Sequence, residues 1–219
     1  MKISWYGQSL FHISSRTKKS QVRISINPFE KETGLKVPTL KTDILLSSNK
    51  KNHNLSFIKD NYFLVDNPGE YEVKGVFIEG IPTFNFKKGK NGKTEKSFDG
   101  NTIYTIEVEN IRICHLGNFN QKKLREYQLE KIGMVDILMI PIGGNDTIAA
   151  EKAVNIMSQI EPGITIPMQY AVPKLKTKLD SLNKFLKLLK AENIKPIEKL
   201  VIKKSEIDPE QPKIITLSI

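Results

Sequence analysis

Short apolar or alternating runs, separated by polar turn residues, fill the chain up to residue 115. Alternation with a period of two buries one face of a strand, so these runs predict strands rather than helices. The strands expected are Lys2–Tyr6, Leu10–Ser14, Val22–Ile26, Asp43–Ser47, Phe63–Val65, Glu70–Val73, Val76–Ile81, Thr102–Val108 and Ile111–His115. Arg16–Ser20 is the expected tip of a hairpin. The Lys- and Gly-rich segment Lys87–Gly100 has no apolar periodicity and is expected to be a mobile loop.

Beyond residue 120 the apolar pattern changes to an alternation of helices and strands. Helices are expected at Gln121–Lys131 and at Thr147–Ile160, where Thr147 is the expected N-cap, and strands at Asp136–Ile140, Ile164–Pro167, Leu200–Lys203 and Lys213–Ile219. A long basic helix is expected to carry Leu175, Leu179, Leu182, Leu186 and Leu189 on one face and lysines on the other. Such a helix either covers a sheet, which we favour, or binds a membrane surface or nucleic acid. The order of elements indicates two sheets with helices outside, within one domain spanning residues 1–219.

Composition narrows the classes of partner and location. The chain has 34 Lys and Arg against 24 Asp and Glu, a formal net charge of +10. This excess makes nucleic acid or another anion a candidate partner, although lysine-rich surfaces also serve solvation alone. No apolar run approaches the roughly 20 residues that span a bilayer. We therefore expect a soluble protein with no membrane partner. A single Cys cannot form an internal disulfide, so we expect this protein in the reducing cytoplasm.

Six short segments occur in a fixed order: Trp5–Phe11, Ile26–Phe29, Pro68–Val76, His115–Asn118, Pro141–Gly144 and Ile166–Tyr170. Their sequence and spacing resemble the metallo-β-lactamase-fold hydrolases, in particular the small bacterial and archaeal branch of Zn-dependent hydrolases. The resemblance runs from Lys2 to about Tyr170. It implies an α+β fold, the αββα four-layer sandwich, with a metal site at one edge built from the loops that follow strands.

The resemblance also implies a dinuclear zinc site, for which this chain lacks most ligands. The family uses a His-x-His-x-Asp-His segment, a later His, an Asp and a final His to hold two metals and a bridging hydroxide. The matching positions hold Ser48, Lys50, Asn52, His53, Asn85, Asn118 and Gln169. Gln8 stands where the family has an early His, and Asn27 where it has an Asp. Amides keep the size and hydrogen bonding of these groups but not their charge or imidazole nitrogen, and the Lys50 ammonium would repel a dication. We conclude that the standard dinuclear site is absent and expect no cofactor.

The remaining groups capable of metal or nucleophilic chemistry are His12, His53, His115 and Cys114. His53 and His115 either bind a single Zn weakly or, as we favour, hydrogen-bond inside a leftover polar pocket. Neighbouring strand residues point to opposite faces, so Cys114 and His115 are not expected to form a nucleophile pair. His12 is expected to be structural.

The loop containing Gly143 and Gly144 leads toward a helix and borders the site in the family. A helix N-terminus together with Lys50 and Lys51 would suit an anionic ligand.

The sequence supports two functional hypotheses. The preferred one is a non-catalytic homologue that acts as a binding module, with an anion or nucleic acid as candidate ligands. The alternative is a metal-dependent hydrolase of phosphoesterase, nuclease or lactamase type with a reduced site.

Overall fold

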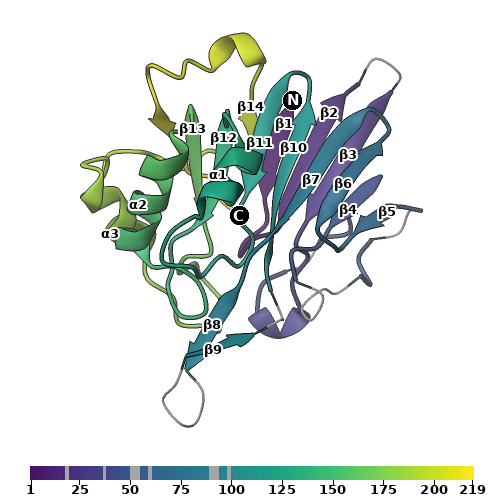
Figure 1. Cartoon of the computed structure of the whole chain (residues 1–219). Helices are drawn as coiled ribbons and strands as arrows, with labels where there is room; N and C mark the ends of the chain where they lie inside the picture. The colour runs from purple at the N-terminus through teal and green to yellow at the C-terminus, as the bar shows by residue number, and fades with distance from the viewer. Residues whose placement is uncertain (18–19, 37, 50–54, 59–60, 89–93, 98–99) are drawn as a thin grey trace.

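The alternating runs form two mixed sheets in the computed structural model, which describes residues 1–17, 20–36, 38–49, 55–58, 61–88, 94–97 and 100–219 (Figure 1). The first sheet contains, in spatial order, β14 (Leu200–Val201), β1 (Lys2–Trp5), β2 (Phe11–Arg16), β3 (Gln21–Ile26), β4 (Ile44–Leu46) and β5 (Phe63–Val65). The second contains β15 (Lys213–Ile214), β13 (Ile164–Met168), β12 (Ile137–Pro141), β11 (Ile111–His115), β10 (Thr102–Val108), β7 (Val76–Pro82) and β6 (Gly69–Val73). The strands predicted from alternation are therefore confirmed, with ends that move by a few residues.

The apolar faces of the two sheets meet in one core. Ile13 and Ile24 of the first sheet belong to the same buried cluster as Ile78, Ile106 and Ile113 of the second. Strand pairs β3–β4 and β4–β5 are parallel, as are β11–β12 and β12–β13, whereas the hairpins at the other side of each sheet are antiparallel. This arrangement confirms the predicted sandwich of two mixed sheets.

The described residues form three α-helices, which lie over the second sheet: α1 (Glu126–Ile132), α2 (Ala150–Ile160) and α3 (Leu182–Leu188). Contacts join α1 to β7 and α2 to β12, and α3 packs on α2 (Figure 1). The outer face of the first sheet is covered near residues 29–58 by connecting segments that include the 3₁₀ turn η1 (Lys31–Thr33). A second 3₁₀ turn, η2 (Lys204–Glu206), follows β14. No helix in the described part of the chain is both long and apolar enough to cross a bilayer.

Two helix starts were predicted too early. Helix α1 begins at Glu126 and not at Gln121, because the buried Gln121 side chain bonds Gln128 and accepts from the Phe84 amide. Helix α2 begins at Ala150, so Thr147 is not its N-cap. The Thr147 hydroxyl instead donates to the Gly144 carbonyl at 3.0 Å and closes the preceding turn.

The long basic helix is also a wrong prediction, since only Leu182–Leu188 is helical. The segment 171–181 is irregular, with a turn at Pro173 and Lys174, because its backbone bonds to other elements. Lys176 N–H donates to Thr33 O at 2.9 Å, and Asp180 N–H donates to Gly143 O at 2.8 Å. These tertiary hydrogen bonds override the leucine periodicity. We call residues 171–181 the strap.

The expected loop at Lys87–Gly100 contains strand structure. Residues Asn85–Lys88 (β8) and Thr94–Ser97 (β9) pair antiparallel as a separate hairpin, which projects from the body of the molecule (Figure 1). Its central residues lie outside the described part of the chain. Cross-strand pairing needs no apolar periodicity, which is why the pattern missed it.

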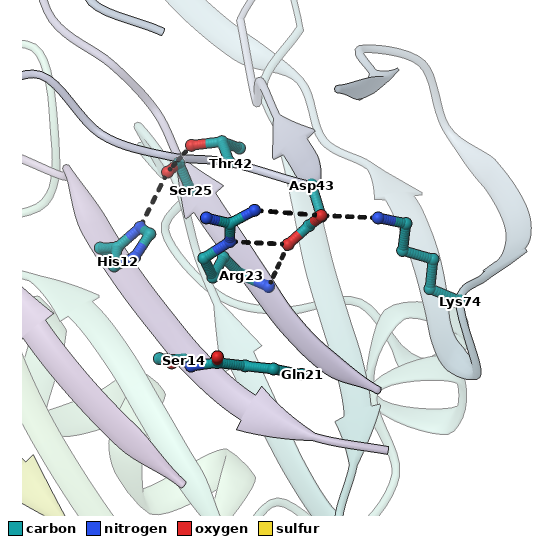
Figure 2. A network of polar contacts seen from close by, with 8 residues as sticks. All are labelled: His12, Ser14, Gln21, Arg23, Ser25, Thr42, Asp43 and Lys74. Atoms are coloured by element: carbon teal, nitrogen blue, oxygen red, sulfur yellow. Dashed lines mark hydrogen bonds and ion pairs between the residues drawn. The ribbon is translucent and has the colours of Figure 1, made fainter. Parts of the chain in front are cut away.

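A polar network lies on the outer face of the first sheet near β2, β3 and β4 (Figure 2). Arg23 Nε donates to Asp43 Oδ2 at 2.9 Å, and Lys74, from the β6–β7 turn of the other sheet, donates to Asp43 Oδ1 at 2.6 Å. Burial acts to raise the pKa of Asp43, but the bonds from Arg23 and Lys74 outweigh it and lower the pKa to about 2. Asp43 thus ties the two sheets together. His12 bonds Ser25 at 3.1 Å within this network, in agreement with its expected structural role.

Candidate functional site

A cavity of about 420 Å³ lies at the edge where β1, β3, β4, β11, β12 and β13 run into their loops. We call it the amide pocket. It brings together the predicted positions Gln8, Ser48, Asn118, Gly144 and Gln169, which come from five separate segments. The ends of adjacent parallel strands meet at one edge of a sheet, and ligands of open α/β sheets bind at such edges. The fold therefore converts scattered motif positions into one lining.

Other predicted positions lie elsewhere or cannot be placed. Lys50, Asn52 and His53 fall outside the described residues, as does Lys51. Of Asn85 the structure describes only the backbone, at the start of β8 opposite Ser97. Gly143 lies directly behind Gln169, since a Cβ on Gly143 would overlap the Gln169 carbonyl oxygen.

Asn27 and Ser48 form a buried pair on the floor of the amide pocket. Asn27 Nδ2 donates to Ser48 Oγ at 2.6 Å, and the Ser48 backbone N–H donates to Asn27 Oδ1 at 2.7 Å. Asn27 Nδ2 also approaches Ser9 Oγ at 3.4 Å. Because one amide donates and accepts at once, an ionised Asp could not make the same set of bonds.

Asn118 and Gln169 form a second pair across the pocket. Gln169 Nε2 donates to Asn118 Oδ1 at 2.6 Å, and the Asn118 backbone N–H donates to Asn101 Oδ1 at 2.6 Å. Gln169 is 8% exposed, and its Oε1 atom has no partner in the described part of the chain. Two positions that the resemblance assigns to metal ligands therefore bond directly to each other.

The backbone is strained where these side chains converge. Gln8, Asn27 and Gln169 have φ values of +49°, +51° and +53°, and the Gln169 N–H donates to the Gln8 carbonyl at 3.1 Å. Non-glycine residues in this left-handed region cost about 1–3 kcal/mol each and cluster at functional sites. Their convergence marks the amide pocket as the functional edge of the fold.

His115 lies behind the pocket with both ring nitrogens engaged. Its Nδ1 accepts from the Gly117 N–H at 3.1 Å, so Nε2 carries the proton and donates to the Ser9 carbonyl at 3.1 Å. Burial lowers the pKa of His115 to about 4, which keeps the ring neutral near pH 7. These bonds leave no lone pair for a metal and support the interpretation of His115 as a structural residue. Burial also disfavours the charged form of the neighbouring Cys114 thiol and raises its pKa to about 12.

Some pocket residues were not anticipated. The strap contributes Thr177 and Leu179, and the two carboxylates of the described lining are Glu30 and Asp146. The strap was missed because its leucine spacing predicted a helix. No described Lys, Arg or His lines the pocket, and no residue of α2 does.

The donors of the described lining do not fit a dinuclear zinc site. Zinc takes His nitrogen, Cys sulfur or carboxylate oxygen, and structural sites use about four such ligands. Glu30 and Asp146 are the only groups of these types in the described lining, and the described residues contain no cluster of three His, Cys, Asp or Glu that suits a metal. The sequence adds Lys50 and Asn52 at two further family positions.

Comparison with known proteins identifies the family. This chain spans about half the length of the first archaeal relatives it matches, among them a UPF0173 metal-dependent hydrolase of Pyrococcus horikoshii, 28% identical over 119 residues (52% of this chain and 51% of that protein). A UPF0173 metal-dependent hydrolase of Lysinibacillus sphaericus is 27% identical over 204 residues, covering 78% of this chain and 85% of the relative.

A solved structure from Thermotoga maritima, named as a Zn-dependent hydrolase of the metallo-β-lactamase superfamily, superposes with a TM-score of 0.79 at 28% identity, covering 99% of this chain and 97% of that one. Residues 2–169 match the family model described as the beta-lactamase superfamily domain. The chain belongs to the metallo-β-lactamase superfamily.

Proposed function

We propose that this protein is a non-catalytic member of its superfamily, which binds a ligand in the amide pocket without a metal pair. The observation that carries the proposal is the hydrogen bond from Gln169 to Asn118, at two positions where the family would hold metal. The Asn27–Ser48 pair supports it, because its donors and acceptors are satisfied within the protein. The polar groups of the described lining bond to one another and include neither an imidazole nor converging carboxylates, which suits ligand binding better than metal-assisted hydrolysis.

The named activity of the relatives favours a second candidate, a metal-dependent hydrolase with a reduced site. Such a site would have to draw on His53, Glu30 and Asp146 with water or amide oxygens, because both nitrogens of His115 are engaged. Anion binding is a further possibility for the binding role. It rests on the +10 charge and on Lys50 and Lys51, whereas the described lining carries only the carboxylates Glu30 and Asp146.

Hydrolase assays test the proposal. Purified protein would be assayed on a phosphodiester, a single-stranded nucleic acid and a β-lactam, before and after addition of Zn²⁺ or Mn²⁺. We expect no metal-dependent turnover above that of the buffer. Turnover that rises with added metal and disappears with a chelator would support the hydrolase instead. Nucleic-acid binding is tested in parallel: binding that falls steeply as salt rises would assign the +10 charge to phosphate contacts.

We also propose a cytoplasmic location. The single cysteine, Cys114, is free and completely buried, which fits a protein that needs no oxidising compartment to fold. Fractionation of the source cells with an antibody against this chain tests the proposal, and recovery outside the cytoplasm would refute it.

A further inference from the structure

The described lining of the amide pocket is mostly uncharged, which points to a neutral ligand. Seven of the nineteen described lining residues are Asn or Gln and six are Ser or Thr, so neutral hydrogen-bonding groups dominate the surface that a ligand would contact. The two carboxylates, Glu30 and Asp146, are not buried, and no described cation accompanies them. The buried floor, made by Ser9, Asn27, Ser48 and Gln169, is uncharged. Neither an anion nor a cation finds a buried partner of opposite charge in this lining.

Gln169, which lines this pocket, contains an unsatisfied group. Its amide bonds Asn118 through one end, and the other end, Oε1, is buried without a partner in the described part of the chain. Exchanging oxygen and nitrogen in both amides would preserve the bond and leave the nitrogen of Gln169 unpaired instead. In either orientation one buried polar atom of Gln169 lacks a partner, and buried polar groups are normally satisfied. A ligand that hydrogen-bonds this atom would supply the missing partner.

Asn118 offers the complementary group beside it. The Asn118 side chain uses Oδ1 for Gln169, and its Nδ2 makes no bond in the described residues. The two bonded side chains of the lining therefore carry, between them, one unpaired acceptor on Gln169 and one unpaired donor on Asn118 in the described residues. Two adjacent hydroxyls match this pair, since one can donate to Gln169 while its neighbour accepts from Asn118.

We infer that the amide pocket binds a neutral polyhydroxylated molecule of sugar size through Gln169 and Asn118. The cavity of about 420 Å³ falls within the usual range of small-molecule sites, about 300–1,000 Å³. A flat nucleobase fits the described lining less well. The one aromatic ring of that lining, Phe29, is 7% exposed and offers little face on which a base could stack. The inference rests on the proposed function, because a metal pair would occupy the same wall.

Calorimetric titration of the purified protein tests the inference. The probes are D-glucose and D-ribose, with inorganic phosphate, spermidine and adenine as alternatives of other chemistry. We expect saturable binding of at least one sugar, at millimolar affinity or better, and none of the three alternatives. Failure of both sugars to bind, or binding of phosphate, spermidine or adenine in this pocket, would overturn the inference.

Matched variants assign the binding to the pocket. Gln169→Met keeps the length of the side chain but removes its amide, and we expect it to weaken sugar binding by about tenfold or more. Thr216→Val removes the other buried unsatisfied side-chain atom of the described residues, outside the pocket lining, and is expected to leave binding unchanged. Asn118→Ser, at a partly exposed position, tests the donor should the Gln169 variant misfold. Unchanged binding in both Gln169→Met and Asn118→Ser would refute the assignment.

The same samples separate the two proposals. Two metal ions per chain would contradict the proposed function whether or not a sugar binds. Metal-free protein that binds neither sugar would contradict only this inference.

Discussion

Replacement of His115 by Gln tests the electrostatic account of the site in a specific pH window. The folded pKa of His115 is about 4, against an ordinary value of 6.5, because burial disfavours the charged ring and outweighs the hydrogen bond to the Ser9 carbonyl, which acts to raise the pKa. Between pH 6.5 and pH 4 the unfolded chain therefore binds more protons than the folded one. The contribution of His115 to stability is complete above pH 6.5 and declines as the pH falls toward 4.

The magnitude follows from this difference. At about 1.36 kcal/mol for each unit of pKa, the fall from 6.5 to about 4 corresponds to roughly 3 kcal/mol lost by pH 4. His12 behaves in the same direction, because burial and the nearby Lys2 and Arg23 lower its pKa to about 4. The two histidines together would remove a large share of the roughly 5–15 kcal/mol that stabilises a typical domain.

Urea unfolding between pH 4 and pH 8 measures this effect. Wild-type stability is expected to be flat above pH 7 and to fall below it, whereas His115→Gln is less stable at pH 7 but loses less on acidification. The matched control, His12→Gln, should also flatten the profile while leaving the pocket bonds of His115 intact. Parallel profiles for wild type and His115→Gln would refute the assignment of a neutral buried imidazole.

Two further predictions concern the scaffold that holds the pocket. Asp43→Asn should lower the unfolding free energy at pH 7 by about 2 kcal/mol in urea titrations, because it removes a carboxylate that Arg23 and Lys74 stabilise. The difference in stability between wild type and variant should vanish as the pH falls from about 4 to about 2. An unchanged difference at pH 2 would contradict this origin. Gly117→Ala should destabilise by about 2 kcal/mol or more in thermal unfolding, since its Cβ would overlap Asn101 Oδ1 and lie 2.5 Å from Ser48 Oγ. Gly75→Ala is the control, with a positive φ of 76° but its nearest neighbour at 3.5 Å, and equal losses in the two variants would exclude the packing explanation.

The strands could be predicted from the sequence because their pattern records burial directly. Phe11 and Ile13 alternate with His12 and Ser14, and the structure buries the first pair in the core and leaves the second pair on the outer face. The strap could not be predicted in this way. Its leucines have helical spacing, but its conformation depends on partners far away in the sequence, such as Thr33 and Gly143. Local pattern carries no information about such tertiary hydrogen bonds.

The candidate site was accessible only through the resemblance. Composition showed that histidine and cysteine are scarce, and the family motif indicated that Ser48, Asn118 and Gln169 stand at ligand positions. The sequence could not show that Gln169 bonds Asn118 while its other end stays unsatisfied, because that depends on the orientation of two side chains from the loops that follow β11 and β13. The place of His53 at the site stays a prediction, because this residue lies outside the described part of the chain.

Metal stoichiometry measures whether the amide pocket holds a zinc pair. Wild-type protein and the variant carrying Ser48→His, Lys50→His, Asn52→Asp, Asn118→Asp and Gln169→His would be dialysed against Zn²⁺, freed of excess metal and submitted to elemental analysis. We predict that the wild type retains much less than one zinc ion per chain and that the variant retains more, because imidazole and carboxylate replace amides, a hydroxyl and an ammonium. Two tightly bound zinc ions in the wild type would contradict the account.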